Sequence, residues 1–409
     1  MTAGRDGRVS AQSAKLTMAF SNVGHFFTHF LMLIYATVVL ALDGKFALSY
    51  GELLSLSLPG FILYGAAALP AGWLGDRWSA EAMMVIFFIG SGAAAILTGL
   101  ATSPLGIGIG LSLIGLFGSI YHPVGVAWLV RNAENRGAAL GWNGIFGSLG
   151  LGIAALAAGA MTQFISWRAA FILPGALCIL LGIALSFCVR RGIVAAAKVD
   201  RKPEPEASRA DIVRAFIVLT VTMLAAALIS QAVTVALPKI FAERLPALTG
   251  GSVLGAGGFV TLVFLGSSLA QIVGGWLADR FPLKRVYVTC WALQIPFWFV
   301  AASLINLPLL ATVMLVEVLQ IFTLPAENSL LVRYTPARWR ATAFGAKFAL
   351  IGLSAAAIPL VGMIYDATGG FYALLVVLTL LAAVIVAAAV FLPADARRGT
   401  LRAAVQSAE

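Results

Sequence analysis

The sequence predicts an all-α integral membrane protein, and three observations lead to that fold class. Of the 409 residues, 61% are hydrophobic and only 11% are charged, whereas about 25% of the residues of a soluble domain are charged. The apolar residues gather in stretches of about 20 residues, the length that spans a bilayer. Short sequences of the first half also recur in the second half. A soluble enzyme and a nucleic-acid-binding protein are therefore excluded, although the net charge is +10.

The apolar stretches predict twelve transmembrane helices. These begin near Lys15, Tyr50, Ala82, Pro104, Arg136, Trp167, Asp211, Ser252, Arg285, Pro308, Arg340 and Gly370. The first stretch follows basic residues, as the apolar region of a signal peptide does, but it is too long for such a region. We therefore interpret it as a retained first helix.

The basic residues predict the orientation of the helices. Of the 27 Lys and Arg residues, 22 fall on the side of the two termini and four on the other side. The positive-inside rule then places both termini in the cytoplasm and the chain in the inner (cytoplasmic) membrane as a multi-pass protein. A polar stretch predicts a cytoplasmic linker at 190–210, between six-helix bundles at 1–189 and 211–393, with a cytoplasmic tail at 394–409.

The two halves are related by an internal repeat. The segment GWLGDRW (72–78) recurs as GWLADRF (275–281) at an offset of 203, LVR (129–131) recurs at 331–333, and RGAALG (136–141) recurs as RATAFG (340–345). Pro123 and Pro325 each precede the repeated arginine by eight residues, which predicts a bend at the same height in both helices. Parallel repeats of this kind are related by an axis along the membrane normal.

Twelve predicted helices, a basic linker and a doubled Gly-x-Leu-x-Asp-Arg loop resemble the major facilitator superfamily of secondary transporters over nearly the whole chain. The resemblance implies that fold and a switch that joins the halves on the cytoplasmic side in one conformation. The switch residues would be Gly72, Asp76, Arg77, Gly275, Asp279 and Arg280. The first loop lacks the basic run that usually follows the motif, so we expect a weaker latch there. The alternative is that these are ordinary positive-inside loop charges.

Two further motifs resemble the fosmidomycin-resistance-type branch, whose members export drugs or metabolites. They are GHFFTH at 24–29 and YHP at 121–123. Antiporters of the superfamily usually carry a Gly-Pro pair in a glycine-rich fifth helix. Here the glycines are present, but Leu151 stands at the position expected for the proline, so the direction of transport stays open.

All three histidines fall within predicted membrane spans, where an ionisable group is a functional candidate by default. His25 and His29 are four residues apart and share a helix face, and His122 lies at a similar depth. Imidazoles can carry protons near neutral pH, so we expect them, with Asn143, to line the substrate or proton pathway. Each histidine could instead bond a backbone carbonyl. We expect no metal site, because no acidic ligand lies near them in the sequence.

The second half offers three more candidates for this pathway. Glu327 and Lys347 fall at one depth on neighbouring predicted helices, which predicts an ion pair that protonation of Glu327 would break. A static structural pair is the alternative. Glu317 lies deeper and is a possible second proton site, or a permanently neutral acid that faces another helix.

These features predict a proton-coupled secondary active transporter that works by alternating access and exports a small organic molecule or drug by H⁺ antiport. The alternative is proton-driven uptake, by symport, of a small organic anion or metabolite. We expect no enzyme activity and no cofactor, with the proton gradient as energy source. We expect a monomer in the lipid bilayer, with protons and a small-molecule substrate as partners and no nucleic acid. A transporter-derived sensor remains open.

Overall fold

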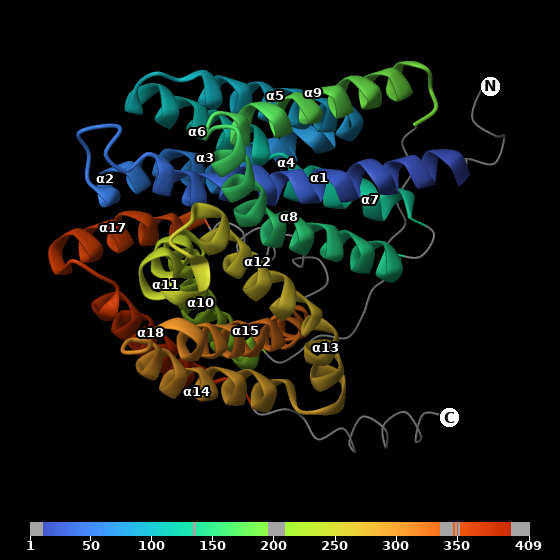
Figure 1. Cartoon of the computed structure of the whole chain (residues 1–409). Helices are drawn as coiled ribbons and strands as arrows, with labels where there is room; N and C mark the ends of the chain where they lie inside the picture. Colours follow the sequence, from blue (N-terminus) through green and yellow to red (C-terminus); the bar gives the residue numbers. More distant parts are fainter. Residues whose placement is uncertain are drawn as a thin grey trace, which may run out of the picture.

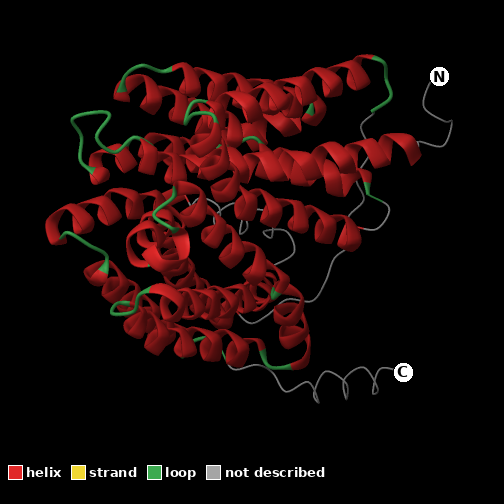
Figure 2. Cartoon of the chain, in the orientation of Figure 1, coloured by secondary structure: helices red, strands yellow, loops and turns green. Residues whose placement is uncertain are grey.

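The computed structural model describes residues 11–133, 136–194, 209–335, 347, 350 and 352–393, and this part of the chain contains helices and no strand (Figures 1 and 2). The first half consists of α1 (Ala11–Val38), η1 (Val39–Ala41), α2 (Tyr50–Ser55), α3 (Leu58–Ala66), α4 (Ala68–Arg77), α5 (Ala80–Leu100), α6 (Pro104–Gly118), η2 (Tyr121–Gly125), α7 (Val126–Asn132), α8 (Arg136–Phe164) and α9 (Ala169–Arg190). The second half consists of α10 (Arg209–Arg244), α11 (Pro246–Thr249), α12 (Val253–Leu269), α13 (Gln271–Arg280), α14 (Leu283–Ala301), α15 (Asn306–Tyr334), η4 (Ser354–Ala356), α17 (Ala357–Thr368) and α18 (Tyr372–Ala389).

The predicted spans correspond to these helices. Ten segments of the described chain are long and apolar enough to cross a membrane. Helix α14, at the ninth predicted span, is not among them, and the eleventh span is only partly described. The number of twelve and the cytoplasmic termini therefore stay predictions. Most of the predicted linker and the whole tail at 394–409 lie outside the described residues.

Serine caps mark where several helices begin. The hydroxyl groups of Ser49, Ser79, Ser103 and Ser252 accept the N–H groups of Glu52, Ala82, Gly106 and Gly255. Each bond satisfies a backbone donor that has no partner within its own helix. At α2 the Glu52 carboxylate also accepts the Ser49 N–H at 2.8 Å, which completes a capping box.

The two halves lie one above the other in Figure 1, and they touch most closely at one end. Gly51 of α2 meets Gly362 of α17, where a Cβ built on Gly51 would lie 3.0 Å from the Gly362 backbone. Helices α8 and α12 cross, and the Leu156 N–H donates to Thr261 Oγ1 at 3.1 Å. We call the end where α2 meets α17 the closed end; it lies at the left of Figure 1.

The opposite end, where α4 and α13 finish, is called the motif end because it carries the two repeated Asp-Arg loops. Helices α4 and α13 pack mainly within their own halves. Gly144 on α8 and Gly275 on α13 have no neighbour among the described residues within 4 Å of a built Cβ. Within the described part of the chain, the halves are therefore in closer contact at the closed end than at the motif end.

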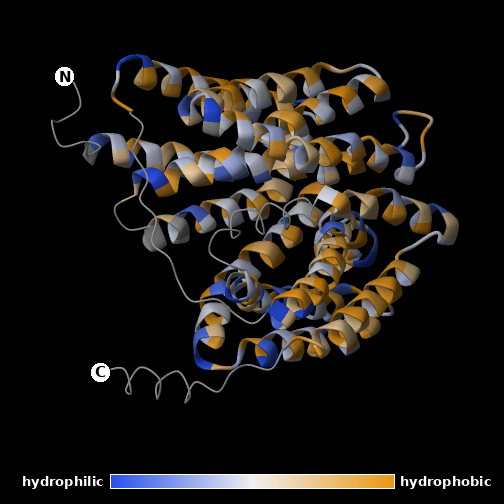
Figure 3. Ribbon diagram, turned by 180° about the vertical axis from the view of Figure 1, so that it is seen from behind, coloured by the Kyte–Doolittle hydropathy of each residue, from blue (hydrophilic) through white to orange (hydrophobic). Residues whose placement is uncertain are grey.

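Apolar side chains cover the outward faces of the helices. Figure 3 shows orange, hydrophobic residues along much of the length of the helices. Leu180 of α9, Leu262 of α12 and Leu380 of α18 are each more than half exposed. Such a surface suits lipid rather than water, because a soluble protein rarely leaves large contiguous apolar patches uncovered.

Candidate functional site

A histidine cluster lies in the first half. His25 and His29 face the same side of α1, with their Nε2 atoms 3.2 Å apart. The ring of His122 approaches both, with centroids 5.3 and 5.4 Å away. All three side chains are half-buried. The predicted shared face of His25 and His29 is confirmed, and His122 joins them from another helix.

His122 owes its place to a π-helical turn. Pro123 has no N–H to donate, and the backbone from Tyr121 to Gly125 widens into η2 between α6 and α7. The repeat-related Pro325 lies inside the uninterrupted helix α15. The two prolines were predicted to bend their helices at one height. The structure shows a π turn at the first proline and a continuous α-helix at the second, so the local backbones differ, and the common bend stays a prediction.

Asn143 of α8 organises the groups behind the cluster. Its backbone carbonyl accepts the Nδ1–H of His25 at 2.7 Å. Its amide donates to the Tyr121 hydroxyl at 2.8 Å and to Asn22 Oδ1 at 3.1 Å. Tyr121 in turn stacks on the His25 ring, with centroids 5.0 Å apart. Asn143 is only 2% exposed; its backbone carbonyl holds His25 and its side chain holds Tyr121, and its place in the pathway stays a prediction.

The hydrogen bond to Asn143 sets the proton positions on the imidazoles. A carbonyl can only accept, so the His25 Nδ1 must carry the proton. In the neutral ring the His25 Nε2 is then a lone-pair acceptor, and His29 Nε2 donates to it. The carbonyl bond that was weighed as an alternative for His25 is present, but it occupies only one of the two ring nitrogens.

A close approach of α8 to α1 fixes the position of His25. A Cβ built on Gly147 would lie 2.5 Å from His25 Cε1, and one on Gly150 would meet the backbone of Phe26. Any side chain at either position would push the two helices apart. The glycines of the fifth predicted span therefore bring the Asn143 carbonyl within reach of the imidazole.

An ion pair is the centre of the second half. Lys347 Nζ lies 2.8 Å from Glu327 Oε1, as predicted, with side-chain exposures of 14% and 5%. The Tyr287 hydroxyl donates to Glu327 Oε2 at 3.0 Å. Lys347 also donates to Asn328 Oδ1 at 2.7 Å. The carboxylate and the ammonium are thus paired and further hydrogen-bonded, which is what buried charges require.

Glu317 lies on α15, ten residues before Glu327. It is 6% exposed, and its Oε1 has no hydrogen-bond partner among the described residues. Gln320 Oε1, one turn further along, likewise lacks one. A buried carboxylate oxygen without a partner is costly in the charged form of the acid. Both predictions for Glu317, a second proton site and a permanently neutral acid, stay open.

The repeated loop motifs adopt matching local structures. Arg77 lies over the Trp73 ring at 4.4 Å, and Arg280 lies over the Trp276 ring at 5.5 Å. Gly72 packs against Pro123, with a built Cβ 3.1 Å from the Pro123 Cβ. The side chain of Asp76 lies outside the described residues. That these motifs join the halves stays a prediction.

Glu81, just after the first motif, is held by its own half. The Trp128 Nε1–H donates to Glu81 Oε1 at 3.1 Å, and the Ser79 hydroxyl donates to Oε2 at 2.8 Å. The residue that departs from the basic run of the resembled motif thus anchors the start of α5 to α7. The sequence shows that Glu81 stands where the motif usually has a basic residue, but it does not indicate Trp128 as the partner.

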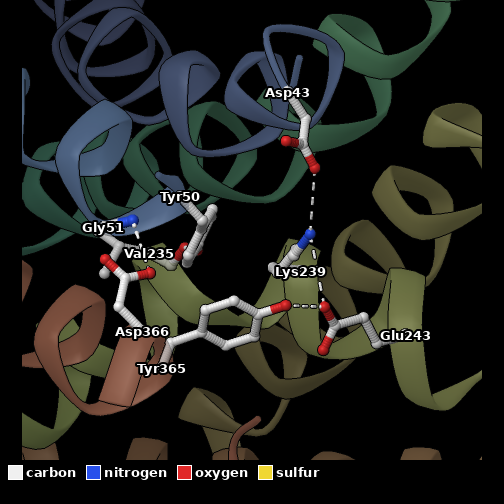
Figure 4. A network of polar contacts seen from close by, with 8 residues as sticks. All are labelled: Asp43, Tyr50, Gly51, Val235, Lys239, Glu243, Tyr365 and Asp366. Carbon is white, nitrogen blue, oxygen red and sulfur yellow. Dashed lines mark hydrogen bonds and ion pairs between the residues drawn. The ribbon is translucent and has the colours of Figure 1, made fainter. Parts of the chain in front are cut away.

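A polar network joins the halves at the closed end, and we call it the closing network (Figure 4). Lys239 of α10 lies 3.6 Å from Asp43 of the first half and 3.4 Å from Glu243 of its own helix. The Tyr365 hydroxyl donates to Glu243, and the Tyr50 hydroxyl donates to the Val235 carbonyl. Three of these side chains come from the second half and two, Asp43 and Tyr50, from the first, and none was predicted to act in the switch.

Asp366 of α17 supplies a second connection between the halves. Its Oδ1 accepts the Gly51 N–H at 3.3 Å (Figure 4). Its Oδ2 accepts the Ser49 hydroxyl at 2.7 Å. Contacts between residues of different halves leave no periodic pattern in the sequence. The partners of Asp43 and Asp366 could therefore not be predicted from it.

A groove of about 550 Å³ runs beside this network and is lined by Leu48, Gly51, Glu52, Ser55, Leu56, Pro104, Leu105, Pro359, Met363 and Asp366. It touches neither the histidine cluster nor the Glu327–Lys347 pair. We therefore leave it outside the candidate site, which consists of those two polar groups and the closing network.

The sequence matches the family model described as "Major Facilitator Superfamily" over residues 20–262 and 219–407. No curated protein matches the chain. Among solved structures, an inward-facing bacterial homolog of the human lysosomal transporter Spinster is similar with a TM-score of 0.73, 16% identity, and coverage of 94% of this chain and 95% of that chain. A peptide transporter POT in complex with sulfate gives a TM-score of 0.74, 15% identity and 95% coverage of both chains.

A D-xylose-proton symporter is also similar, with a TM-score of 0.71, 13% identity, and coverage of 93% of this chain and 97% of that chain. At these identities the likeness concerns the fold alone. The resemblance to the fosmidomycin-resistance-type branch stays a prediction.

Proposed function

The chain belongs to the Major Facilitator Superfamily, and on that premise we propose that it is a proton-coupled secondary active transporter that exports a small organic molecule in exchange for protons. The family accounts for a multi-pass membrane protein that binds a small-molecule substrate. Proton coupling and export are the parts that this proposal adds.

The buried Glu327–Lys347 ion pair carries the proposal. Removing one partner of a buried pair destabilises a protein by about 3–5 kcal/mol, because the other charge is left uncompensated. Protonation of Glu327 leaves Lys347 in that position without any mutation. The free energy involved is comparable to the few kcal/mol that separate two conformations of a protein. The free energy released or lost when Glu327 binds a proton is therefore large enough to change which conformation is favoured.

The arrangement of the halves supports alternating access. They are joined at the closed end by the closing network and lie further apart at the motif end. With the orientation predicted from the basic residues, the motif end faces the cytoplasm. The conformation would then receive a substrate from the cytoplasm, and export would require the closing network to separate.

The chemistry of the two polar groups indicates the class of substrate. Imidazoles and tyrosine rings on one side, and an ammonium released from its carboxylate on the other, suit a weakly anionic, amphiphilic small molecule. Such a molecule would compete with the Glu327 carboxylate for Lys347, so protonation of Glu327 favours its binding. Export by exchange additionally requires that the proton leaves Glu327 in the conformation that takes up the substrate, whereas binding of proton and anion together is the arrangement of the second candidate.

Uptake of a small organic anion by proton symport is the second candidate. The side chain of Lys347 keeps 14% of its exposure while paired, so a proton on Glu327 would offer its ammonium to an anion. Leu151, in place of the proline expected in an exporting antiporter, favours the same direction. In this case proton and anion would bind together rather than in exchange.

Everted membrane vesicles test coupling and direction. A respiratory substrate acidifies the vesicle interior, a pH-quenched dye reports the gradient, and weak acids, phosphonates and cationic drugs are added one at a time. For an antiporter, a transported compound releases protons and restores the fluorescence. Glu327→Gln should abolish this response, because the amide cannot take up the proton. An unchanged response in Glu327→Gln would contradict the role of Glu327.

Glu52→Gln is the matched control, since it makes the same chemical change at an exposed carboxylate. Glutamine can complete the same capping box, so we expect proton release like that of the wild type. If no compound releases protons, right-side-out vesicles with an imposed gradient are tested next. Proton-dependent accumulation of an organic anion there would replace export by uptake.

A further inference from the structure

We propose that His25, His29 and His122 bind one divalent transition-metal ion of the zinc class through three imidazole nitrogens, with a fourth position open to an anionic ligand. The proposal goes beyond the transport function and does not depend on proton coupling at Glu327. It also departs from the sequence-based expectation of no metal site, which rested on the lack of an acidic neighbour. Three properties of the cluster favour a metal ion: the spacing of its nitrogen atoms, the position of the proton on His25, and the residues that hold the rings.

The nitrogen atoms are almost at coordination spacing. One ligand atom from each histidine lies within 4.8 Å of the others, and His25 and His29 are already 3.2 Å apart at their Nε2 atoms. Zinc–nitrogen bonds of about 2.0–2.1 Å in a tetrahedral site place ligand nitrogens about 3.3–3.4 Å apart. Small rotations of half-buried rings would close the remaining difference.

The protonation of the cluster suits a metal. His25 gives its Nδ1 proton to the Asn143 carbonyl, which leaves the Nε2 lone pair directed at its neighbours. Histidine ligands of metals typically donate their other N–H to a carbonyl or a carboxylate in this way, which fixes the tautomer and the ring orientation. The same arrangement is already present here, and a metal ion would take the place of the proton shared by His25 and His29.

The surroundings hold the ligands in place. Two of the rings come from successive turns of α1, and the third comes from the π turn at Pro123. Tyr121 stacks on His25, and Tyr64 meets the His122 ring edge-on at 6.1 Å. Asn143 bonds both His25 and Tyr121. A ligand shell held by its neighbours in this way is already ordered before an ion binds.

The ligand types select the ion and require a fourth partner. The group contains imidazoles and no carboxylate or thiolate, which suits Zn²⁺, Ni²⁺, Co²⁺ or Cu²⁺ rather than Mg²⁺ or Ca²⁺. Three neutral imidazoles leave both charges of a divalent ion uncompensated among apolar helices. The ion would therefore bind together with an anion, so the ligand class is a metal ion with an anionic organic molecule at its open position.

Metal binding is measured on the purified full chain in detergent, with an affinity tag that contains no histidine. All three histidines of the chain belong to the cluster, so any imidazole-based binding reports this site. We expect one Zn²⁺ per chain by equilibrium dialysis, and a visible absorption band when Co²⁺ is used instead. His29→Gln and His122→Gln should each weaken binding at least tenfold, as loss of a ligand does. Zn²⁺ should raise the melting temperature of the wild type but not that of the histidine variants.

Cys188→Ser is the control, because Cys188 is the half-buried cysteine and lies outside the cluster. It should bind Zn²⁺ as the wild type does. Binding that is equally tight in the wild type and in a His29→Gln/His122→Gln double variant would overturn the proposal, as would loss of binding in Cys188→Ser. If the histidine variants do not fold, diethyl pyrocarbonate labelling of the wild type decides. Zn²⁺, but not Mg²⁺, should then protect all three imidazoles.

The open position is tested with acetate and methylphosphonate as probes. Either anion should shift the absorption band of the Co²⁺ form, whereas an unchanged spectrum would contradict an open fourth position. Glu327→Gln should keep full metal binding. Failure of proton coupling with metal binding intact therefore rejects only the transport proposal, and failure of metal binding in the wild type rejects only this one.

Discussion

Gly125 and Asn143 of the first half correspond to Glu327 and Lys347 of the second, at offsets of 202 and 204. In the second half these positions hold a buried ion pair. In the first half the Gly125 carbonyl accepts the Ser21 hydroxyl, and the Asn143 amide binds Tyr121 and Asn22. One scaffold thus supports a charged pair in one repeat and a neutral hydrogen-bonded framework in the other.

The residues around these positions also differ in polarity between the two halves. Tyr287, which donates to Glu327, corresponds to Met84 at the offset of 203. A Cβ built on Gly125 would lie 3.1 Å from Met84 Sδ, so an apolar thioether lies where the second half has a hydroxyl. The comparison teaches that the second half is built around a carboxylate and the first half around imidazoles. Proton coupling and ligand recognition can therefore reside in different repeats.

The largest effect is expected when one charge of the Glu327–Lys347 pair is removed and the other is left. Lys347→Met leaves Glu327 buried with Tyr287 as its remaining partner, and we expect the free energy of unfolding to fall by about 3–5 kcal/mol. Glu327→Gln/Lys347→Met removes both charges and should recover most of that loss. Thermal melting in detergent measures both, with exposed Lys45→Met as the neutral control. A double variant no more stable than Lys347→Met would contradict an uncompensated charge.

The next effect concerns the neutral framework of the first half. A Cβ added at Gly125 would lie 2.8 Å from the Tyr121 ring, so Gly125→Ala should destabilise the protein by about 1–3 kcal/mol through overpacking. Gly144→Ala makes the same change on α8 where no described residue lies within 4 Å, and it should be neutral or slightly stabilising. Equal melting temperatures of the two variants would show that the first half tolerates a side chain at the Glu327 position.

The smallest effect is expected at the closing network. Asp43 is 64% exposed in its pair with Lys239, and an exposed pair contributes about 0–1 kcal/mol. Lys239→Met should thus shift the population away from the present conformation by no more than about fivefold. Spin labels on Trp78→Cys and Phe281→Cys, in a Cys188→Ser background, report the separation of the halves at the motif end.

We expect the population with short label distances to grow in Lys239→Met, because the motif ends approach when the closed end separates. High salt should produce a smaller change of the same sign in the wild type, since screening weakens exposed pairs. Lys45→Met again serves as the control. A distance distribution identical to that of the wild type would exclude Lys239 from holding the halves together.

Much of the helical layout could be predicted, because apolar runs and helix starts are local properties. A described helix begins within four residues of each predicted start except that near Arg340, which lies outside the described residues. The Glu327–Lys347 pair and the His25–His29 pair followed from depth and from helical spacing. Both kinds of reasoning need only the distance along a helix axis.

What could not be predicted depends on how helices are rotated about their axes and on which helices meet. The contacts of Asn143 with Asn22 and His25, and those of Asp43 with Lys239, join residues more than 100 positions apart. A π turn at Pro123 but not at Pro325 depends on packing around the proline, which the repeated sequence does not encode. Orientation, the export branch and the role of the loop motifs stay predictions.

The meeting of Gly51 with Gly362 has a mechanical consequence. The two backbones touch there without intervening side chains, and dispersion contacts lose a quarter to a half of their strength at an added separation of about 0.5–1 Å. The Asp366 carboxylate, which accepts the Gly51 N–H beside this contact, is the group that can reorient to follow a small gap. As the closed end separates, the backbone packing would therefore weaken first and the hydrogen bonds of Asp366 would break last.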